Sequence, residues 1–270
     1  MKNKGQGALE YLLLIGGGLI VTAVVVGLTL SVMDSGSEIG HTAGNKTKSI
    51  LEQGLAEIDI GHAPSLPSGR TAYWPMNENS GNNIPDEEGT NDATNNGATW
   101  VAGRAGNALD FEYSESDYAS AGYVPFNSRS FTISLWIRSE SLTTEHVFFS
   151  QNQSGSSNMS LHLRAYSNGQ IRFGFYMNDL TTSAGAVAAG NWYHLAFVYD
   201  VSAGSRSVYV NGVRRAYQAS GVNPYLGTSG LTRIGRWDIA GQRFDGIIDE
   251  IMIFNRALSE AEVNEVMNLT

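Results

Sequence analysis

The chain of 270 residues contains no cysteine. This absence excludes a disulfide framework, zinc sites built from thiolates and catalysis by a thiol. Positive charge is also scarce, because 17 Lys and Arg oppose 26 Asp and Glu, which gives a formal net charge of −9 and a sequence pI near 5.0. Proteins bind nucleic acid mainly through clustered Lys and Arg, so we expect no nucleic-acid partner.

Proline is rare at 6 residues, whereas glycine is abundant at 31. Glycine together with frequent Asn, Ser and Thr favours tight turns between short strands over a helical bundle. A chain of this length accommodates one large all-β domain and one smaller part.

Residues 11–33 carry no charged side chain. As a helix, this run would cover a hydrocarbon core of about 30 Å and could span a bilayer. Lys2 and Lys4 precede it while Asp34 and Glu38 follow it, so the positive-inside rule places the N-terminus in the cytoplasm and the remainder outside. An ordinary secretory signal peptide is the alternative, but its apolar region spans only about 7 to 15 residues. We therefore predict a protein anchored in the membrane at the cell surface.

Glu10 lies at the edge of this run, where an unpaired carboxylate is costly. The sequence KGQGALEYLLLIGG resembles the archaeal class III signal peptide of type IV pilin-like proteins. The resemblance implies that a prepilin peptidase cleaves between Gly5 and Gln6, and that Gln6 and Glu10 serve assembly with other pilin-like subunits through the N-terminal helix. A plain signal anchor, in which Glu10 pairs with Lys2 or Lys4, is the alternative.

The domain boundaries follow from composition and spacing. Apolar residues return at helical spacing after Asn45, and residues 61–69 (GHAPSLPSG) read as a linker because they contain two Pro and two Gly. We predict a signal peptide at 1–5, an apolar helix and its extension at 6–60, a linker at 61–70 and a β-rich domain at 71–270.

Within the domain, apolar and other residues alternate along 131–138, which predicts a strand with two distinct faces. Asn168-Gly169 and Asn211-Gly212 each lie between alternating segments, and Asn-Gly favours a type I′ hairpin turn. These features predict two antiparallel sheets packed face to face.

One helix is expected at the C-terminal end of the domain. Ser259 and Glu262 have the spacing of a capping box, and Val263 and Val266 fall on one face.

Several segments, in order, resemble a concanavalin A-like domain of the LamG (laminin-G type 3) family. They are residues 72–78 (AYWPMNE), 106–111 (GNALDF), 131–137 (FTISLWI), 192–196 (WYHLA), 209–212 (YVNG) and 244–259 (FDGIIDEIMIFNRALS). The resemblance spans roughly residues 71 to 269. It implies a mainly β fold, a jelly-roll of two curved antiparallel sheets behind the apolar helix.

Glycosidases on this fold use two carboxylates about 5 to 5.5 Å apart when they retain configuration. Asp249 and Glu250 are adjacent in a predicted strand and should point to opposite faces, so they cannot form such a pair. The five histidines show no metal-binding spacing. We expect no catalytic residues and no enzyme activity.

Related jelly-roll domains often hold one structural calcium ion that ties the first strand to the last. The resemblance implies Glu78, Asp86 and Asp249 as ligands, because calcium prefers carboxylate and carbonyl oxygens. Solvated turn carboxylates are the alternative.

Polar and aromatic residues on the strands suggest a ligand-binding face, since aromatic rings and arginines suit carbohydrate. The predicted ligand-binding residues are Trp136, Arg138, His162, Arg164, Tyr166, Arg172, Tyr176 and His194. A plain solvent-facing sheet surface is the alternative. Four glycosylation sequons begin at Asn45, Asn152, Asn158 and Asn268.

The leading hypothesis is a pilin-like subunit of the cell surface, held in the membrane or in an extracellular filament, whose LamG-like domain mediates adhesion by binding a glycan or a protein. The alternatives are a membrane-anchored receptor that does not polymerise and, less favoured, a glycan-cleaving enzyme. A head group of about two hundred residues favours a minor subunit.

Overall fold

The computed structural model describes residues 65–153, 156–238 and 242–270. The part from Pro64 to Thr270 forms one compact unit. The predicted cleavage site, assembly residues, apolar helix and Asn45 all lie outside the described residues. Among the described residues there is no helix of the length and hydropathy needed to cross a membrane.

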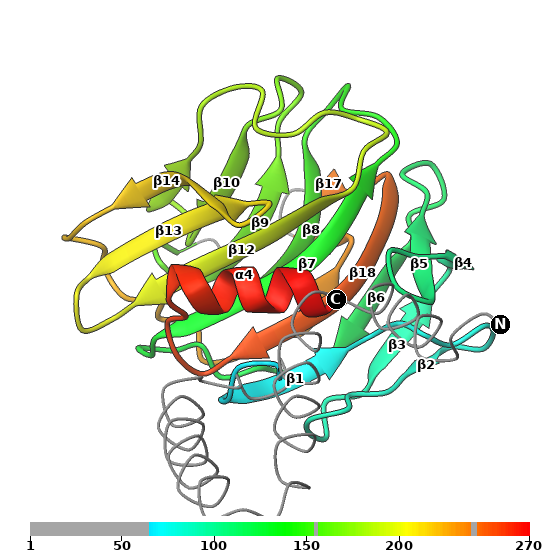
Figure 1. Cartoon of the computed structure of the whole chain (residues 1–270), viewed down its shortest axis with the longest axis horizontal. Coiled ribbons are helices and arrows are strands. Elements are labelled where there is room, and N and C mark those ends of the chain that lie inside the picture. Colours follow the sequence, from blue (N-terminus) through cyan, green and yellow to red (C-terminus); the bar gives the residue numbers. More distant parts are fainter. Residues whose placement is uncertain (1–64, 154–155, 239–241) are drawn as a thin grey trace, which may run out of the picture. The chain divides into compact units, whose positions relative to one another are not determined.

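The described chain forms two large antiparallel sheets and one helix (Figure 1). Sheet A contains, in spatial order, β14 (Val213–Gln218), β13 (Ser205–Val210), β12 (Tyr193–Asp200), β7 (Phe131–Ser139), β18 (Gly246–Phe254), β5 (Asn107–Phe111) and β4 (Thr99–Ala102), with β1 (Arg70–Trp74) also paired to β18. This architecture agrees with the predicted two-sheet, mainly β fold.

Sheet B contains β11 (Asp179–Thr181), β10 (Ile171–Gly174), β9 (Ser160–Ala165), β8 (His146–Asn152), β15 (Thr232–Ile234), β6 (Tyr118–Ala121), β3 (Ala93–Asn96) and β2 (Asn83–Ile84) in spatial order. The short hairpin of β16 (Arg236–Trp237) and β17 (Gln242–Arg243) adjoins β8.

The core lies between the sheets and is rich in aromatic rings. Phe131 of β7 lies 5.9 Å from Phe173 and 5.6 Å from Tyr199, measured between ring centroids. Tilted and edge-on arrangements of this kind are favoured by the quadrupoles of the rings. The alternating residues of the predicted strand at 131–138 therefore supply the inner face, as expected.

The two Asn-Gly hairpins differ. Asn211 and Gly212 have φ of 49° and 73°, as a type I′ turn requires, and β13 and β14 pair directly on either side. At the other hairpin only Gly169 has a positive φ, of 76°, and its N–H donates to the carbonyl of Tyr166. That prediction was wrong in detail, because Tyr166 to Gln170 form a longer loop with glycine in the left-handed position.

Helix α4 (Glu260–Leu269) begins with the predicted capping box of Ser259 and Glu262. Its buried Val263 and Val266 join an apolar cluster with Ala196 of β12 and Met252 of β18. Figure 1 shows α4 lying across β12, β7 and β18. The helix thus covers the outer face of sheet A around these strands, and both faces of β7 are buried along most of its length.

Strand β18 carries a bulge at the point where its pairing partner on one side changes from β5 to β1. It pairs with β5 over 246–248 and with β1 over 251–254. Between these segments the register with β7 shifts, and Glu250 has a φ of 53°. An extra residue at a bulge re-aims the side chains beside it, which bears on the two acidic residues at this point.

Candidate functional site

The predicted ligand-binding residues do not form one groove. Trp136, Arg138 and His194 lie on strands of sheet A, whereas the segment from His162 to Arg172 belongs to sheet B. Tyr176 follows β10 in a turn, with a φ of 67°. The prediction of a single face is corrected accordingly, because the sequence does not show which strands share a sheet.

On sheet A two of the three predicted residues are enclosed, whereas Arg138 is half-buried with its guanidinium 5.8 Å from the Trp192 ring. The Trp136 side chain is 6 % exposed and its Nε1 donates to Thr270 Oγ1 at 2.8 Å. The His194 ring has no exposed surface and its Nε2 lies 2.7 Å from Ser134 Oγ. Burial lowers the pKa of His194 to about 3. Trp136 and His194 are therefore closed to a ligand by the region of α4, contrary to the prediction.

On sheet B four of the predicted residues do come together, around a tryptophan that sequence reasoning missed. We call His162, Arg164, Tyr166, Arg172 and Trp237 the Trp237 cluster. The rings of His162 and Trp237 stack at 4.5 Å. The guanidinium of Arg164 lies 5.1 Å from the Trp237 ring and 5.3 Å from Tyr166, and that of Arg172 lies 4.6 Å from Tyr166.

Hydrogen bonds fix this cluster in place. Arg164 donates to Glu145 at 2.7 Å and to Gln242 at 2.9 Å, while Arg172 donates to Asp179 at 3.1 Å. Trp237 Nε1 donates to Asn152 Oδ1 at 2.6 Å. Trp237 and Arg164 are only 4 % and 7 % exposed and form a rigid support, whereas Tyr166 and Arg172 at the edge of the cluster are partly exposed.

His162 is electrically neutral within this support. Burial, followed by the charge of Arg164, lowers the pKa of His162 to about 3. Its Nε2 lies 3.7 Å from Asp179 Oδ1, but a neutral ring makes no ion pair there. Gly174 stands opposite His162, and a Cβ at that position would collide with the imidazole.

A second group, next to the first, is partly exposed. We call Thr94, Asn96, Tyr118, Ser120, Arg233 and Arg236 the Tyr118 patch. In the sheet register Ser120 lies between Thr94 and Arg233, and Asn96 lies opposite Tyr118. The guanidinium groups of Arg233 and Arg236 lie 5.0 Å and 4.9 Å from the Tyr118 ring. None of these six residues was predicted.

The two groups share the outer face of sheet B. Ser150 of β8 is paired in register with Arg233 of the patch on one side and with His162 of the cluster on the other, so these residues share a face. Alternation places Tyr118 and Ser120 on the side opposite the buried Ala119 and Ala121. Planar guanidinium donors, an amide and hydroxyls on one surface can hydrogen-bond the hydroxyl groups of a sugar.

The sequence predicted that Asp249 and Glu250 point to opposite faces of the sheet. The structure contradicts this prediction. Asp249 Oδ2 accepts the backbone N–H of Arg104 at 2.7 Å, and Glu250 Oε2 accepts the hydroxyl of Tyr73 at 2.6 Å. Tyr73 packs with the outer cluster under α4, and Asp249 pairs with Trp136, which bonds to α4. The bulge at Glu250 brings both carboxyl groups to the outer side of sheet A.

Both acidic side chains are buried, Asp249 fully and Glu250 at 4 % exposure. Burial raises the pKa of Asp249 to about 7, and burial likewise raises the pKa of Glu250. The two carboxyl groups point to the same side of the sheet, but their burial keeps them from a substrate.

The three predicted calcium ligands are not gathered into one cluster. Asp86 accepts backbone N–H groups of Tyr73, Glu88 and Asn91, so its carboxylate anchors a loop. Within the described residues no three His, Cys, Asp or Glu are placed to hold a metal together. Glu78 Oε2 and Asp249 Oδ1 are nevertheless both buried without a hydrogen-bond partner among the described residues.

The sequons are placed differently from one another. Asn152 ends strand β8 and its Nδ2 is buried, so we no longer expect a glycan there. Asn158 is half-buried and its Oδ1 accepts from Asn178 at 2.7 Å. Asn268 is exposed on α4.

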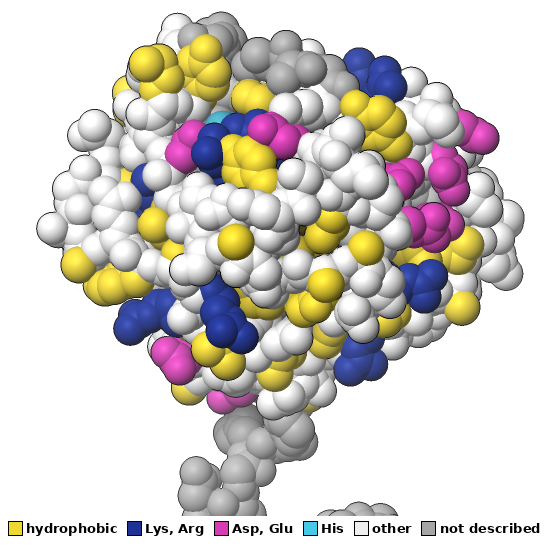
Figure 2. All heavy atoms as spheres, turned by 90° about the horizontal axis from the view of Figure 1, so that it is seen from above, with side chains coloured by type: hydrophobic (Ala, Val, Ile, Leu, Met, Phe, Trp, Pro, Cys, Tyr) yellow, Lys and Arg dark blue, Asp and Glu magenta, His cyan; other side chains and the backbone are white. Residues whose placement is uncertain are grey.

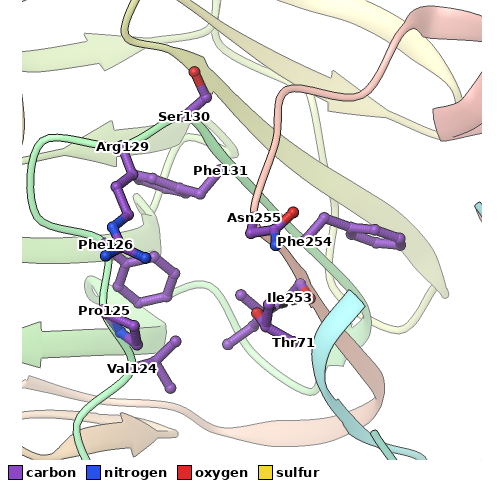
Figure 3. A pocket seen from close by; sticks show the side chains of 10 residues that line it. All are labelled: Thr71, Val124, Pro125, Phe126, Arg129, Ser130, Phe131, Ile253, Phe254 and Asn255. Atoms are coloured by element: carbon purple, nitrogen blue, oxygen red, sulfur yellow. Dashed lines mark hydrogen bonds between the residues drawn. The ribbon is translucent and has the colours of Figure 1, made fainter. Parts of the chain in front are cut away.

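A small pocket lies where the segment before β7 faces the end of β18 (Figure 3). Phe126, Phe131 and Ile253 supply much of its lining, and Arg129 and Asn255 supply polar groups. None of the predicted ligand residues lines it. In the view of Figure 2, most of the visible face is uncharged, and acidic, basic and hydrophobic side chains meet in small groups.

Comparison with known proteins gives a family match over residues 113–264, to the model described as the concanavalin A-like lectin/glucanases superfamily. A search of curated protein sequences finds no match.

Solved structures with similar folds share little sequence. Domain 4 of AbnA, an extracellular arabinanase from Geobacillus stearothermophilus, in complex with arabinotriose, is 20% identical with a TM-score of 0.60, covering 74% of this chain and 98% of that chain. The binding domain of Paraclostridial Mosquitocidal Protein 1 is 16% identical with a TM-score of 0.60, covering 74% and 52%. The binding domain of botulinum neurotoxin DC in complex with SialylT is 14% identical with a TM-score of 0.56, covering 75% and 52%. The chain thus spans about half the length of the two toxin domains.

Proposed function

The chain belongs to the concanavalin A-like lectin/glucanases superfamily, and from this membership we propose that its β-domain binds glycans through the outer face of sheet B. The observation that carries the proposal is the Tyr118 patch, a partly exposed surface of arginine, amide and hydroxyl groups. On sheet A, α4 covers the outer face around β12, β7 and β18, whereas the Tyr118 patch on sheet B stays partly exposed.

The two groups on sheet B have complementary roles in this proposal. In the Trp237 cluster, His162, Arg164 and Trp237 are buried and hydrogen-bonded, so they hold β16 and the strands beneath it in place, while Tyr166 and Arg172 are partly exposed. The Tyr118 patch offers the donors and acceptors that orient a sugar. Pre-organised groups bind more tightly because less side-chain entropy is lost on binding.

The similar structures support the proposal only through their similar fold. One of them is described in complex with arabinotriose, and another with SialylT. Each ligand is bound by the protein in question. At such low sequence identity, the likeness supports a shared fold and not a shared ligand.

A glycan array probed with the full-length protein tests this function. Ser120→Tyr places a bulky side chain in the middle of the Tyr118 patch, and we expect at least a tenfold loss of binding, the equivalent of about 1.4 kcal/mol. Val213→Tyr is the matched control, since Val213 is 53% exposed on strand β14 of sheet A. Absence of binding to every glycan contradicts the proposal. Loss of binding in Val213→Tyr alone would move the ligand to sheet A.

We further propose that the domain is displayed at the cell surface by a pilin-like N-terminal helix. This part rests on the sequence from Gly5 to Met33, which lies outside the described residues. Intact-mass analysis of the native protein checks it, because a mature chain that begins at Met1 instead of Gln6 contradicts processing by a prepilin peptidase. A membrane-anchored receptor is the alternative if processing fails.

We also propose one structural calcium ion beside β18, held by Glu78 and Asp249 with backbone carbonyls. The two orphaned oxygens fit such an ion, because calcium accepts carboxylate ligands without donated hydrogens. Both residues adjoin one turn: Asp249 accepts from Arg104 and Ala105, and Asn77, next to Glu78, bonds to Asn107. Bound calcium would tie the first strand to the last.

Thermal melting with and without a chelator tests the ion. A ligand bound only by the folded state raises the melting temperature, so we expect the chelator to lower it. In Asp249→Asn the chelator should have no effect. An unchanged midpoint in the wild-type protein contradicts the site.

We expect no catalysis from Asp249 and Glu250. The reason is now their burial and not their direction, and hydrolysis of any glycan that the array identifies would overturn this expectation.

A further inference from the structure

Positive charge in the β-domain is carried by arginine alone. Residues 65–270 contain thirteen arginines, no lysine and twenty aspartates and glutamates, which give this part a formal net charge of −7. A domain with this net charge repels anions on average. A surface with excess positive charge must therefore arise from the arrangement of particular arginines.

The Tyr118 patch is such a surface. Arg233 Nε lies 2.9 Å from Asp238 Oδ2, and Arg236 Nε lies 2.7 Å from Asp238 Oδ1. Two guanidinium groups thus share one carboxylate, which leaves one uncompensated positive charge. The side chains of Arg233 and Arg236 are 17% and 31% exposed, so this charge is accessible to a ligand.

The arrangement also orients the two arginines. Tyr118 lies under both guanidinium groups, Arg233 Nε donates a hydrogen bond to Asp238 Oδ2, and Arg236 forms an ion pair with the same carboxylate. In the described part of the chain, the terminal nitrogens of these two arginines donate no hydrogen bond. Paired, planar N–H donors are the geometry that recognises a carboxylate or sulfate through two hydrogen bonds.

Neutral polar groups continue the surface beside the arginines. Ser120 is paired in register with Arg233 on one side and with Thr94 on the other. Asn96 Nδ2 lies 3.4 Å from Ser120 Oγ. Hydroxyl and amide groups next to an anion-binding pair match a sugar that carries both hydroxyls and an acidic group.

We propose that the Tyr118 patch binds an anionic glycan, one whose sugars carry carboxylate or sulfate groups. This inference rests on the proposed glycan binding and adds the chemical class of the ligand. The arginines bind the acidic group, Tyr118 positions them, and the strands β3 and β6 supply contacts to the ring hydroxyls.

Matched polymers test the class of ligand. The full-length protein is immobilised and exposed to polygalacturonate and to its fully methyl-esterified form, which has the same sugars without the charge. Dextran sulfate and dextran form the sulfate arm. We expect each charged polymer to bind at least tenfold more tightly than its neutral partner, and the difference to shrink as salt rises from 50 to 500 mM.

Variants test the residues. Arg236→Gln should weaken binding of the charged polymer about tenfold, since a charge-assisted hydrogen bond is lost. Asp238→Asn removes the competing negative charge but keeps an oxygen that can accept from Arg233 Nε, so it should strengthen binding about threefold. Arg214→Gln is the control, because Arg214 lies 4.4 Å from the exposed Tyr217 on sheet A and its loss changes the net charge equally.

The outcomes separate the two proposals. Equal binding of charged and neutral polymers overturns the anionic class but leaves glycan binding intact. Equal weakening by Arg214→Gln and Arg236→Gln reduces the effect to net charge and overturns the site. Failure of all polymers and of the glycan array contradicts glycan binding itself.

Discussion

Each sheet carries a tryptophan, a histidine and an arginine packed together on its outer face. On sheet A these are Trp136, His194 and Arg104, with ring centroids 5.4 Å apart and the guanidinium 4.5 Å from the indole. On sheet B the Trp237 cluster repeats the combination, with a stacked ring pair at 4.5 Å.

The surroundings of the two groups differ. Trp136 donates to Thr270 at the end of α4, and the helix closes the face beside it. Trp237 donates to Asn152 of sheet B itself, and the neighbouring Tyr118 patch stays partly exposed. Similar side chains therefore become part of a second core on one sheet and the border of an open surface on the other.

The largest expected effect tests whether α4 is essential to sheet A. Val263→Asp places a carboxylate in the fully buried cluster with Met252 and Phe254. Burying an unpaired charge is among the costliest substitutions, so we expect a loss of about 4 kcal/mol or more in the free energy of unfolding. The melting temperature should fall by about 10 °C or more.

Ser120→Asp introduces the same carboxylate on the half-exposed face of sheet B. Thermal denaturation should show a change below about 1 kcal/mol, since surface substitutions are well tolerated. Equal losses in both variants would erase the contrast between a covered and an open face.

The second effect is a pH dependence that the two sheets should share. His162 and His194 each have a pKa of about 3 in the folded protein. The unfolded chain takes up a proton below about pH 6.5, so stability from each neutral histidine is present above that pH and is lost as pH falls toward 3.

Chemical denaturation at pH 7 and pH 5 measures this loss. The wild-type protein should lose about 2 kcal/mol more than His162→Gln over that interval, because the variant has no proton to take up. The raised pKa of Asp249 acts with the opposite sign, and the difference between the two proteins cancels it. If His162 titrates near pH 6.5 by NMR, the Trp237 cluster is open to water and the comparison must be revised.

The smallest effect concerns the two hairpins. Asn211 has a φ of 49° and its Oδ1 accepts the N–H of His194 at 2.9 Å, whereas Asn168 needs no left-handed conformation. We expect Asn211→Ala to cost about 1 to 2 kcal/mol, since it adds backbone strain and removes a hydrogen bond. Asn168→Ala should cost about half as much or less. A larger loss at Asn168 in urea titrations would contradict the assigned turn types.

Local signals predicted local structure well. The capping box of Ser259 and Glu262 and the type I′ turn at Asn211 depend on neighbouring residues, so the sequence contains the whole cause. The strand at 131–138 was likewise predicted from its alternation, but the burial of its second face was not. Alternation cannot show that a helix more than a hundred residues later will cover that face.

The candidate site was predicted only in part for the same reason. Four members of the Trp237 cluster come from one hairpin, which its sequence pattern indicated, but Trp237 comes from a distant segment. The Tyr118 patch joins β3, β6 and β15 through pairings that no short motif specifies. The bulge at Glu250 reversed the prediction for Asp249 and Glu250 because a single left-handed residue changes which way a side chain points.

The pairing of β1 with β18 also sets how the domain responds to tension. A pull on the chain ahead of Arg70 is resisted by the hydrogen bonds that Ser68 and Gly69 accept from Arg256 and Asn255, and then by the pairing of β1 with residues 251–254 of β18. Because β18 is also paired with β7 on both sides of its bulge, the load passes into the interior of sheet A and not to a peripheral strand. If the proposed N-terminal anchor and the proposed glycan site on sheet B both hold, force between them would pass through β18, which is paired with β1, β5 and β7.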